Sequence, residues 1–169
     1  MTGVTESDPT GMGKPGFIDP SCYVGELNGM NPRGTADEYP CVGTTYRVAE
    51  HWQAGQMTRN HPWLNEIQPE VFAEIGPELA ADRGISNGDK VRVSTARGHV
   101  DAVAVVTNRM HRMTIGGKSV DHVGVPWHWG YVGLSSADAS SGNILTPHVG
   151  DANTTIPEYK TFLCNITKV

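Results

Sequence analysis

Residues 89–107, DKVRVSTARGHVDAVAVVT, carry the clearest structural pattern in the chain. Apolar or β-branched residues alternate with their neighbours on both sides of the turn Ala96-Arg97-Gly98. They are Val91, Val93 and Thr95 before the turn, and Val100, Ala102, Ala104 and Val106 after it. Alternation with a period of two around a glycine-bearing turn predicts a β-hairpin with one buried face.

Shorter segments on either side of this hairpin also have β character, with one compact helix among them. The helix is predicted over GPELAADRG, with Gly76 as its N-cap, Pro77 as its first residue and Gly84 after its end. Further strands are expected at residues 41–48, 71–75 and 162–169 and near 120–125. Six or seven short strands with one or two small helices predict a mainly β fold, a β-barrel with small helical additions.

The composition is that of an ordinary globular chain and excludes several classes of protein. Of 169 residues, 38% are hydrophobic and 18% are charged, and the net charge is −5. An acidic balance argues against a dedicated nucleic-acid binder, which normally has a basic face. No run approaches the roughly 20 apolar residues that a membrane-spanning helix needs, and the first 16 residues lack the basic and apolar regions of a signal peptide.

The chain divides at residue 40. Residues 1–40 are rich in Gly, Pro, Ser and Asn and have too few apolar residues for a core. We therefore expect an extended arm that lies on a partner chain, followed by a barrel domain at residues 41–169. The three cysteines, Cys22, Cys41 and Cys164, form no CxxC pair and no metal-binding spacing, so buried thiols are expected.

Three polar and aromatic segments, predicted to be loops, form the candidate binding surface: residues 44–59, 126–130 and 143–160. The first is rich in hydrogen-bonding side chains: Thr44, Thr45, Arg47, His51, Gln53, Thr58 and Arg59. This mixture suits a phosphorylated heterocycle, because arginine binds phosphate while amides and imidazole hydrogen-bond ring edges. A solvated loop with internally satisfied polar groups explains the same residues.

The other two segments also admit a structural explanation. His128 lies between Trp127 and Trp129, and a histidine between aromatic residues is often a packed core or interface residue. The stretch GDANTTIPEYK, residues 150–160, suits a turn before a strand as well as a binding loop. The chain contains no GxSxG, HExxH or GxxxxGK motif, so hydrolase, zinc-protease and P-loop chemistry are not predicted.

Five ordered motifs resemble the C-terminal dinucleotide-binding domain of molybdenum and tungsten enzymes that carry two pyranopterin guanine dinucleotides. They are TTYRVAEHWQAGQMTR (44–59), PEVFAEIGPELAADRGISNGDKVRVSTARGHV (69–100), GVPWHWG (124–130), NILTPHVGDANT (143–154) and PEYK (157–160). The resemblance covers residues 39–169 and favours the formate dehydrogenase catalytic subunit, especially the membrane-associated respiratory type. It implies a six-stranded double-psi β-barrel.

The resemblance also implies which residues contact the cofactor, a bis(molybdopterin guanine dinucleotide) with molybdenum or tungsten. The first segment would contribute Thr45, Arg47, His51, Gln53 and Thr58, the second Trp127 and His128, and the third Asn143, Asn153, Tyr159 and Lys160. No residue of the chain is expected to be catalytic or to bind the metal, because the family's cysteine or selenocysteine ligand and its iron–sulfur motif belong to earlier domains.

The expected partner is therefore a large catalytic chain that shares the cofactor and carries the metal ligand and a 4Fe–4S cluster. An iron–sulfur electron-transfer subunit is expected beside it, and the complex would oxidise formate to carbon dioxide or catalyse the reverse reaction. We hypothesise that the chain is a naturally split subunit, although a fragment of a longer chain fits as well. The respiratory relatives imply a periplasmic, membrane-associated complex, with a cytoplasmic one still open.

Three alternatives remain at this point. The same domain serves nitrate reductases, and the metal-ligand region of the partner would distinguish the two substrates. A barrel that assists cofactor assembly would dissociate from the catalytic chain, whereas a subunit would copurify with it. A cofactor-free structural barrel is disfavoured by the density of polar residues in the three segments.

Overall fold

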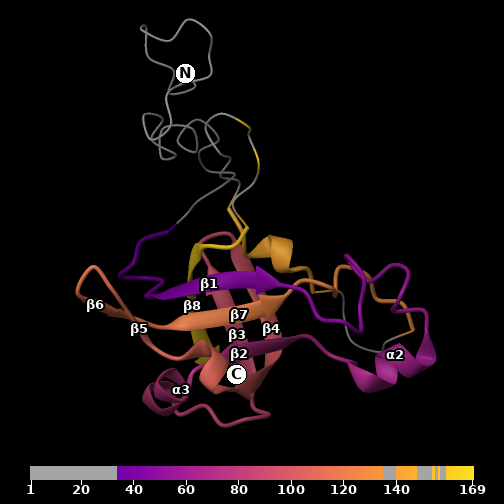
Figure 1. Ribbon diagram of the computed structural model, residues 1–169, viewed down its shortest axis with the longest axis horizontal. Coiled ribbons are helices and arrows are strands. Elements are labelled where there is room, and N and C mark those ends of the chain that lie inside the picture. Colours follow the sequence, from indigo (N-terminus) through magenta and orange to yellow (C-terminus); the bar gives the residue numbers. More distant parts are fainter. Residues whose placement is uncertain (1–33, 135–139, 148–153, 155, 157–158) are drawn as a thin grey trace, which may run out of the picture.

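The computed structural model describes residues 34–134, 140–147, 154, 156 and 159–169. Its centre is a closed barrel of six strands in the order β1-β7-β2-β4-β3-β8 (Figure 1). The strands are β1 (Cys41–Tyr46), β2 (Phe72–Ile75), β3 (Lys90–Thr95), β4 (Gly98–Val106), β7 (His122–Pro126) and β8 (Phe162–Lys168). The predicted mainly β, six-stranded barrel with small helices is confirmed.

The hairpin that was predicted first is β3–β4. The two strands are antiparallel, and Thr95 lies opposite Gly98 across the two-residue turn. On β3, Val91 and Val93 are fully buried, and on β4 the alternating residues from Val100 to Ala104 are buried as well. The alternation in the sequence therefore marks the face of the hairpin that points into the barrel.

Two parallel strand pairs and the antiparallel pair of β1 with β8, called the β1–β8 seam, bring segments that are distant in sequence together. β1 is parallel to β7 and antiparallel to β8, while β2 is parallel to β4. Cys41 lies opposite Cys164, and Gly43 lies opposite Phe162. The chain leaving β1 and the chain entering β8 therefore meet at one end of the barrel. This meeting point positions the candidate site.

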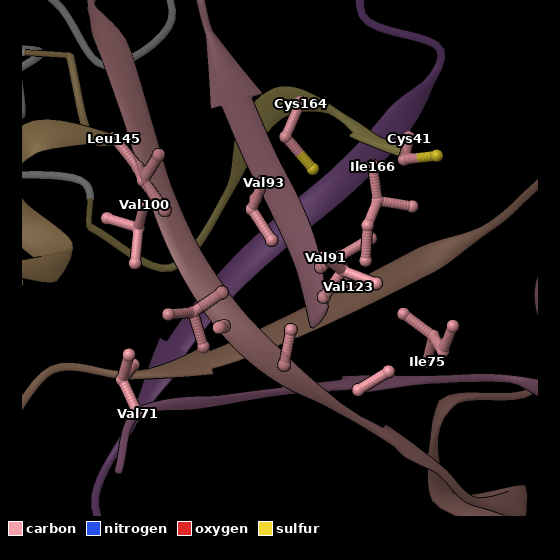
Figure 2. Close-up of a cluster of buried hydrophobic side chains, with 14 of the residues drawn as sticks. Cys41, Val71, Ile75, Val91, Val93, Val100, Val123, Leu145, Cys164 and Ile166 are labelled. Carbon is pink, nitrogen blue, oxygen red and sulfur yellow. The ribbon is translucent and has the colours of Figure 1, made fainter. Parts of the chain in front are cut away.

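The barrel interior is filled by hydrophobic side chains from all six strands and the connecting segments, and most of them are branched aliphatic. Figure 2 shows Val91, Val93, Val123 and Ile166 pointing into a common core, and each of them is fully buried. Burial of such side chains contributes roughly 1.5–3 kcal/mol each. The interior is thus a packed core, so ligands must bind at the ends or on the outside of the barrel.

The helix α3 (Pro77–Arg83) is confirmed with the predicted ends. Gly76 is its N-cap, Pro77 its first residue, and Gly84 closes it in a left-handed conformation with φ of 62°. A second helix, α2 (Pro62–Ile67), agrees with the expected one or two small helices, but its place in the chain was not predicted, and it buries none of its residues. Two short 3-10 helices, η1 (Asn108–Met110) and η2 (Gly142–Ile144), complete the helical elements of the described residues.

The expectation of a single strand near residues 120–125 was incomplete. The structure has an additional hairpin there, formed by β5 (Met113–Ile115) and β6 (Lys118–Val120), before β7 begins at His122. Gly116 and Gly117 form its turn with φ of 57° and 79°, as a two-residue hairpin turn requires. The strands are three residues long and largely exposed, so they show no alternation of buried residues.

Residues 1–33 of the predicted arm lie outside the described residues, and its contact with a partner stays a prediction. Residues 36–38 form a turn, which is closed by a hydrogen bond of 2.9 Å from the Tyr39 backbone N–H to the Thr35 carbonyl. β1 then begins at Cys41. Within the described part of the chain, no helix has the length and apolar character to span a membrane.

Candidate functional site

A pocket of about 250 Å³ lies where the ends of β1 and β7 meet the segment before β8. Six residues line it, and all six were predicted to contact a cofactor: Thr45, Arg47, Trp127, Asn143, Tyr159 and Lys160. They come from each of the three polar segments, which therefore converge in the structure. Thr44 to Tyr46, at the start of the first segment, belong to strand β1, in agreement with the strand predicted at residues 41–48.

Hydrogen bonds between β1 and the segment before β8 build one wall of the pocket. The Thr45 hydroxyl donates to the Tyr159 carbonyl at 2.8 Å. The Lys160 ammonium donates to the Thr45 carbonyl at 2.6 Å. Thr45 is itself buried, with 5% of its surface exposed. Because β1 and β8 are paired, these contacts are local in space, although the residues are 114 and 115 positions apart.

Two cations give the pocket its electrostatic character. The Arg47 guanidinium lies 5.0 Å from the centre of the Trp127 ring, within cation–π range. Partial burial lowers the pKa of Lys160, and the charge of Arg47 lowers it further. Its surroundings therefore disfavour the positive charge of the Lys160 ammonium, and an anion in the pocket would stabilise both cations.

The His128 side chain packs against Trp127, the tryptophan that lines the pocket. The Trp127 and His128 rings are stacked with centroids 5.7 Å apart and an angle of 22° between their planes. His128 is fully buried. Its Nε2 accepts a hydrogen bond from the Val48 backbone N–H at 2.9 Å, and its Nδ1 lies 2.6 Å from the Gln53 carbonyl oxygen. Nδ1 must therefore carry the proton, and burial lowers the pKa of this imidazole.

A second buried histidine organises the loop that follows β1. The His51 Nε2 lies 2.8 Å from the Gln68 carbonyl, so this nitrogen donates, and Nδ1 is 3.3 Å from the Thr58 hydroxyl. The same hydroxyl oxygen accepts a hydrogen bond from the Trp52 backbone N–H. Gln53 has a left-handed conformation, with φ of 50°, and contributes its carbonyl to this region. These hydrogen bonds stabilise the conformation of the loop that follows β1.

The eleven predicted cofactor residues thus divide into three groups. Six line the pocket. Four belong to the hydrogen-bond network behind it, namely His51, Gln53, Thr58 and His128. Asn153 lies outside the described residues. For all eleven, contact with a cofactor remains a prediction.

Two residues outside the eleven predicted cofactor contacts also support the site, and one of them, Arg59, was named among the polar side chains of the first segment. Arg59 is completely buried; its Nε donates to the Tyr131 carbonyl at 2.7 Å and its Nη2 to the Val132 carbonyl at 3.2 Å. Gly142 lies so close to Trp127 that a Cβ at this position would be 3.1 Å from the Trp127 Cβ. These supporting roles could not be predicted, because both depend on contacts with residues distant in the chain.

Among the described residues, no group of three or more His, Cys, Asp or Glu side chains could hold a metal ion. The two described cysteines are buried free thiols. Burial, assisted by the nearby charge of Asp121, raises the pKa of Cys41 to about 11, and burial also raises the pKa of Cys164. Both are therefore protonated at neutral pH and unsuited as metal ligands or nucleophiles.

The donor set fits part of a pterin dinucleotide. Two cations suit a pyrophosphate, an indole face suits a planar ring, and the Asn143 amide can both donate and accept hydrogen bonds. The volume of about 250 Å³ is below the usual range of about 300–1,000 Å³ for whole-ligand pockets. A dinucleotide bound here must therefore extend beyond this pocket.

Comparison with known proteins identifies a family and several similar proteins. The model of the family described as "Molydopterin dinucleotide binding domain" matches residues 42–163. The alpha subunit of formate dehydrogenase from Megalodesulfovibrio gigas is 51% identical over 130 residues, which are 77% of this chain and 13% of that protein. The formate dehydrogenase-O major subunit of Escherichia coli (strain K12) is 50% identical over 137 residues, 80% of this chain and 13% of that protein. This chain thus spans only 13% of the length of these relatives.

A solved structure with the same fold is acetylene hydratase from Pelobacter acetylenicus. The match has a TM-score of 0.62 with 16% sequence identity, and covers 88% of this chain and 20% of the hydratase chain. At this identity the likeness concerns the fold alone. It supports the barrel as a domain that occurs within much longer polypeptides.

Proposed function

The chain belongs to the molydopterin dinucleotide binding domain family, and from this premise we propose that its pocket binds the phosphate-bearing part of a molybdopterin guanine dinucleotide. The observation that carries the proposal is the convergence of Arg47, Lys160 and Trp127 on one pocket. A pyrophosphate is anionic, and guanidinium and ammonium groups are its usual partners in proteins. The lowered pKa of Lys160 marks a cation that an anion would stabilise.

Each pocket residue has a distinct part in this binding. Arg47, oriented by the Trp127 face, would donate paired hydrogen bonds to phosphate oxygens. Lys160, held by the Thr45 carbonyl, would supply a second positive charge. Asn143, which lines the pocket and is exposed, would hydrogen-bond a ring edge. When bound, the cofactor supplies a molybdenum or tungsten centre for electron exchange with the substrate.

The activity proposed for the whole protein is the oxidation of formate to carbon dioxide, with release of one proton and two electrons, or the reverse reaction. The relatives that are 45–51% identical are named as formate dehydrogenase subunits, and the five motifs favour the same branch. The chain's own role would be to hold the dinucleotide, orient the pterin and exclude water. The metal ligand and a 4Fe–4S cluster would reside in other domains of the catalytic polypeptide, with an iron–sulfur electron-transfer subunit beside it.

We also propose a periplasmic, membrane-associated location for the complex, which the resemblance to respiratory enzymes supports. Fractionation of cells that express the native gene would test this. Recovery in the periplasmic or membrane fraction is expected, and recovery in the cytoplasm alone would contradict it.

Analysis of the assembled native protein tests the binding proposal and the activity separately. Acid hydrolysis should release guanosine monophosphate in proportion to protein-bound molybdenum or tungsten, and formate should reduce an artificial electron acceptor. Absence of guanine nucleotide from metal-containing protein would overturn the binding proposal. Presence of the nucleotide without any formate-dependent reduction would retain the binding and overturn the substrate.

A further inference from the structure

The end of the molecule that carries α2 has an unusually apolar surface. We name residues 51–67 and 129–134 the aromatic lobe. In Figure 1, α2 marks this lobe at the end of the barrel opposite the β5–β6 hairpin. In the first part of the lobe, four large hydrophobic side chains are 56–64% exposed: Trp52, Met57, Trp63 and Ile67. The second part adds Tyr131, Val132 and Leu134, which are 41–61% exposed.

The two parts of the aromatic lobe form one unit. The buried Arg59 donates hydrogen bonds to the Tyr131 and Val132 carbonyls, and the Arg59 carbonyl accepts one from the Leu134 backbone N–H at 2.9 Å. A Cβ at Gly133 would lie 2.3 Å from the Arg59 carbonyl oxygen, so glycine permits this close approach. The apolar side chains are therefore presented by a connected scaffold.

The helix of the aromatic lobe gains little stability from burial. The helix α2 has six residues and buries none of them, and helices shorter than about 12 residues are marginal in water without tertiary contacts. Trp63 and Ile67 lie four positions apart and thus on the same side of this helix. Exposed clusters of large apolar side chains usually mark a surface that another protein surface covers.

We propose that the aromatic lobe docks on an apolar surface of the polypeptide that completes the catalytic unit. This rests on the proposed function. A dinucleotide bound in this small pocket would extend beyond it, and a second surface at the mouth of the pocket would cover the part left outside. The lobe is continuous with the pocket through Trp127-His128-Trp129, because the His128 ring supports Trp127 and contacts Trp129. In the relatives, the matched region is only 13% of the polypeptide, which leaves ample chain to supply that surface.

The chemistry of the lobe specifies the kind of contact. Apart from the Tyr131 phenol, its ionisable residues are His51 and Arg59, which are buried, and His61 and Glu66, which are exposed. One exposed acid among seven exposed apolar groups gives little basis for an ionic interface or for adsorption to an anionic lipid surface. The docking should therefore depend on apolar burial and persist at high salt.

Hydroxyl-radical labelling of the assembled enzyme tests the docking. Each residue's labelling rate in the native enzyme is divided by its rate in the same protein unfolded in denaturant. Trp63 and Met57 should label at less than a fifth of their unfolded rates, in low salt and in 1 M NaCl. Ile115 at the opposite end, which is 51% exposed, should retain more than half of its unfolded rate.

A pair of variants sharpens the result. Trp63→Ser should raise the labelling of Met57 at least threefold, whereas Ile115→Ser should leave it within 1.5-fold of the wild-type value. Unprotected Trp63 and Met57 in an enzyme that retains its guanine nucleotide would overturn the docking and leave the proposed function intact. Protection of Trp63 and Met57 in an enzyme that lacks the guanine nucleotide would support the docking and overturn the proposed function. Protection that appears only as the protein is concentrated would assign the lobe to a second copy and would also overturn the proposal.

Discussion

The Arg47 side chain is exposed, and its guanidinium lies against the Trp127 ring. Removal of this side chain should therefore affect ligand binding far more than folding. We predict that Arg47→Ala lowers the pterin content of the purified enzyme at least tenfold while the free energy of unfolding changes by less than about 0.5 kcal/mol, as for other exposed sites. Pterin fluorescence and chemical denaturation measure the two quantities.

Arg92→Ala is the matched control for this prediction. Arg92 lies on β3 and is paired with Asp101, at 2.7 Å, and it is absent from the pocket lining. This variant should keep the wild-type pterin content. Equal pterin loss in both variants, or none in Arg47→Ala, would remove Arg47 from the binding site.

His128 makes folding sensitive to acid. Burial lowers its pKa below the ordinary value of 6.5, so the unfolded chain takes up a proton at a higher pH than the folded protein. The stability that neutral His128 contributes is complete above about pH 6.5 and is lost as the pH falls from there towards the lowered pKa. The loss per group cannot exceed about 1.4 kcal/mol per pH unit.

Replacement of His128 by glutamine should remove this contribution. A glutamine can still donate and accept hydrogen bonds, but it does not titrate. We predict that His128→Gln is less stable than the wild type at pH 7.5 and loses less stability between pH 7.5 and 5.5. Urea denaturation at the two values measures this, and an undiminished loss in the variant would contradict a buried neutral His128.

At the scale of elements, the side chains between the paired strands β1 and β8 are packed so tightly that no additional atom fits at Gly43. A Cβ on Gly43 would lie 2.3 Å from Cε2 of Phe162, the residue opposite it. We predict that Gly43→Ala destabilises the protein by about 1–3 kcal/mol through overpacking. Phe162→Leu should recover part of this loss in the double variant, because the smaller side chain removes the clash. Strict additivity of the two single effects in thermal unfolding would show that they do not share this contact.

How well an element could be predicted depended on how many of its side chains it buries. The β3–β4 hairpin was predicted because Val91, Val93 and Val100 face the core and their neighbours do not. The helix α2 and the β5–β6 hairpin bury almost nothing, so no periodicity reveals them. The pair Gly116-Gly117 was the available signal for the additional turn.

The candidate site shows the same limit. Composition identified the three polar segments, but it could not separate pocket-lining residues from supporting ones. Whether a histidine faces a pocket or a backbone carbonyl depends on partners distant in sequence: His51 reaches Gln68, and His128 reaches Val48 and Gln53. These partners are fixed only when the barrel closes.

At the scale of the whole molecule, the barrel determines whether the pocket exists. Ile166 is fully buried on β8, and we predict that Ile166→Ala costs about 2–5 kcal/mol of stability through the cavity that it leaves. Pterin content should then fall together with the melting temperature, unlike in Arg47→Ala, where it falls alone. Scanning calorimetry with pterin fluorescence distinguishes the two patterns. A melting temperature equal to that of the wild type would contradict the packed core.

Cryo-electron microscopy of the assembled, cofactor-loaded enzyme tests the central claim most directly. The map should place a pyrophosphate oxygen within about 4 Å of the Arg47 guanidinium or the Lys160 ammonium, the range of an ion pair, and a second polypeptide surface at the mouth of the pocket. A dinucleotide bound elsewhere, with Arg47, Trp127 and Lys160 facing bulk water, would contradict the proposed function.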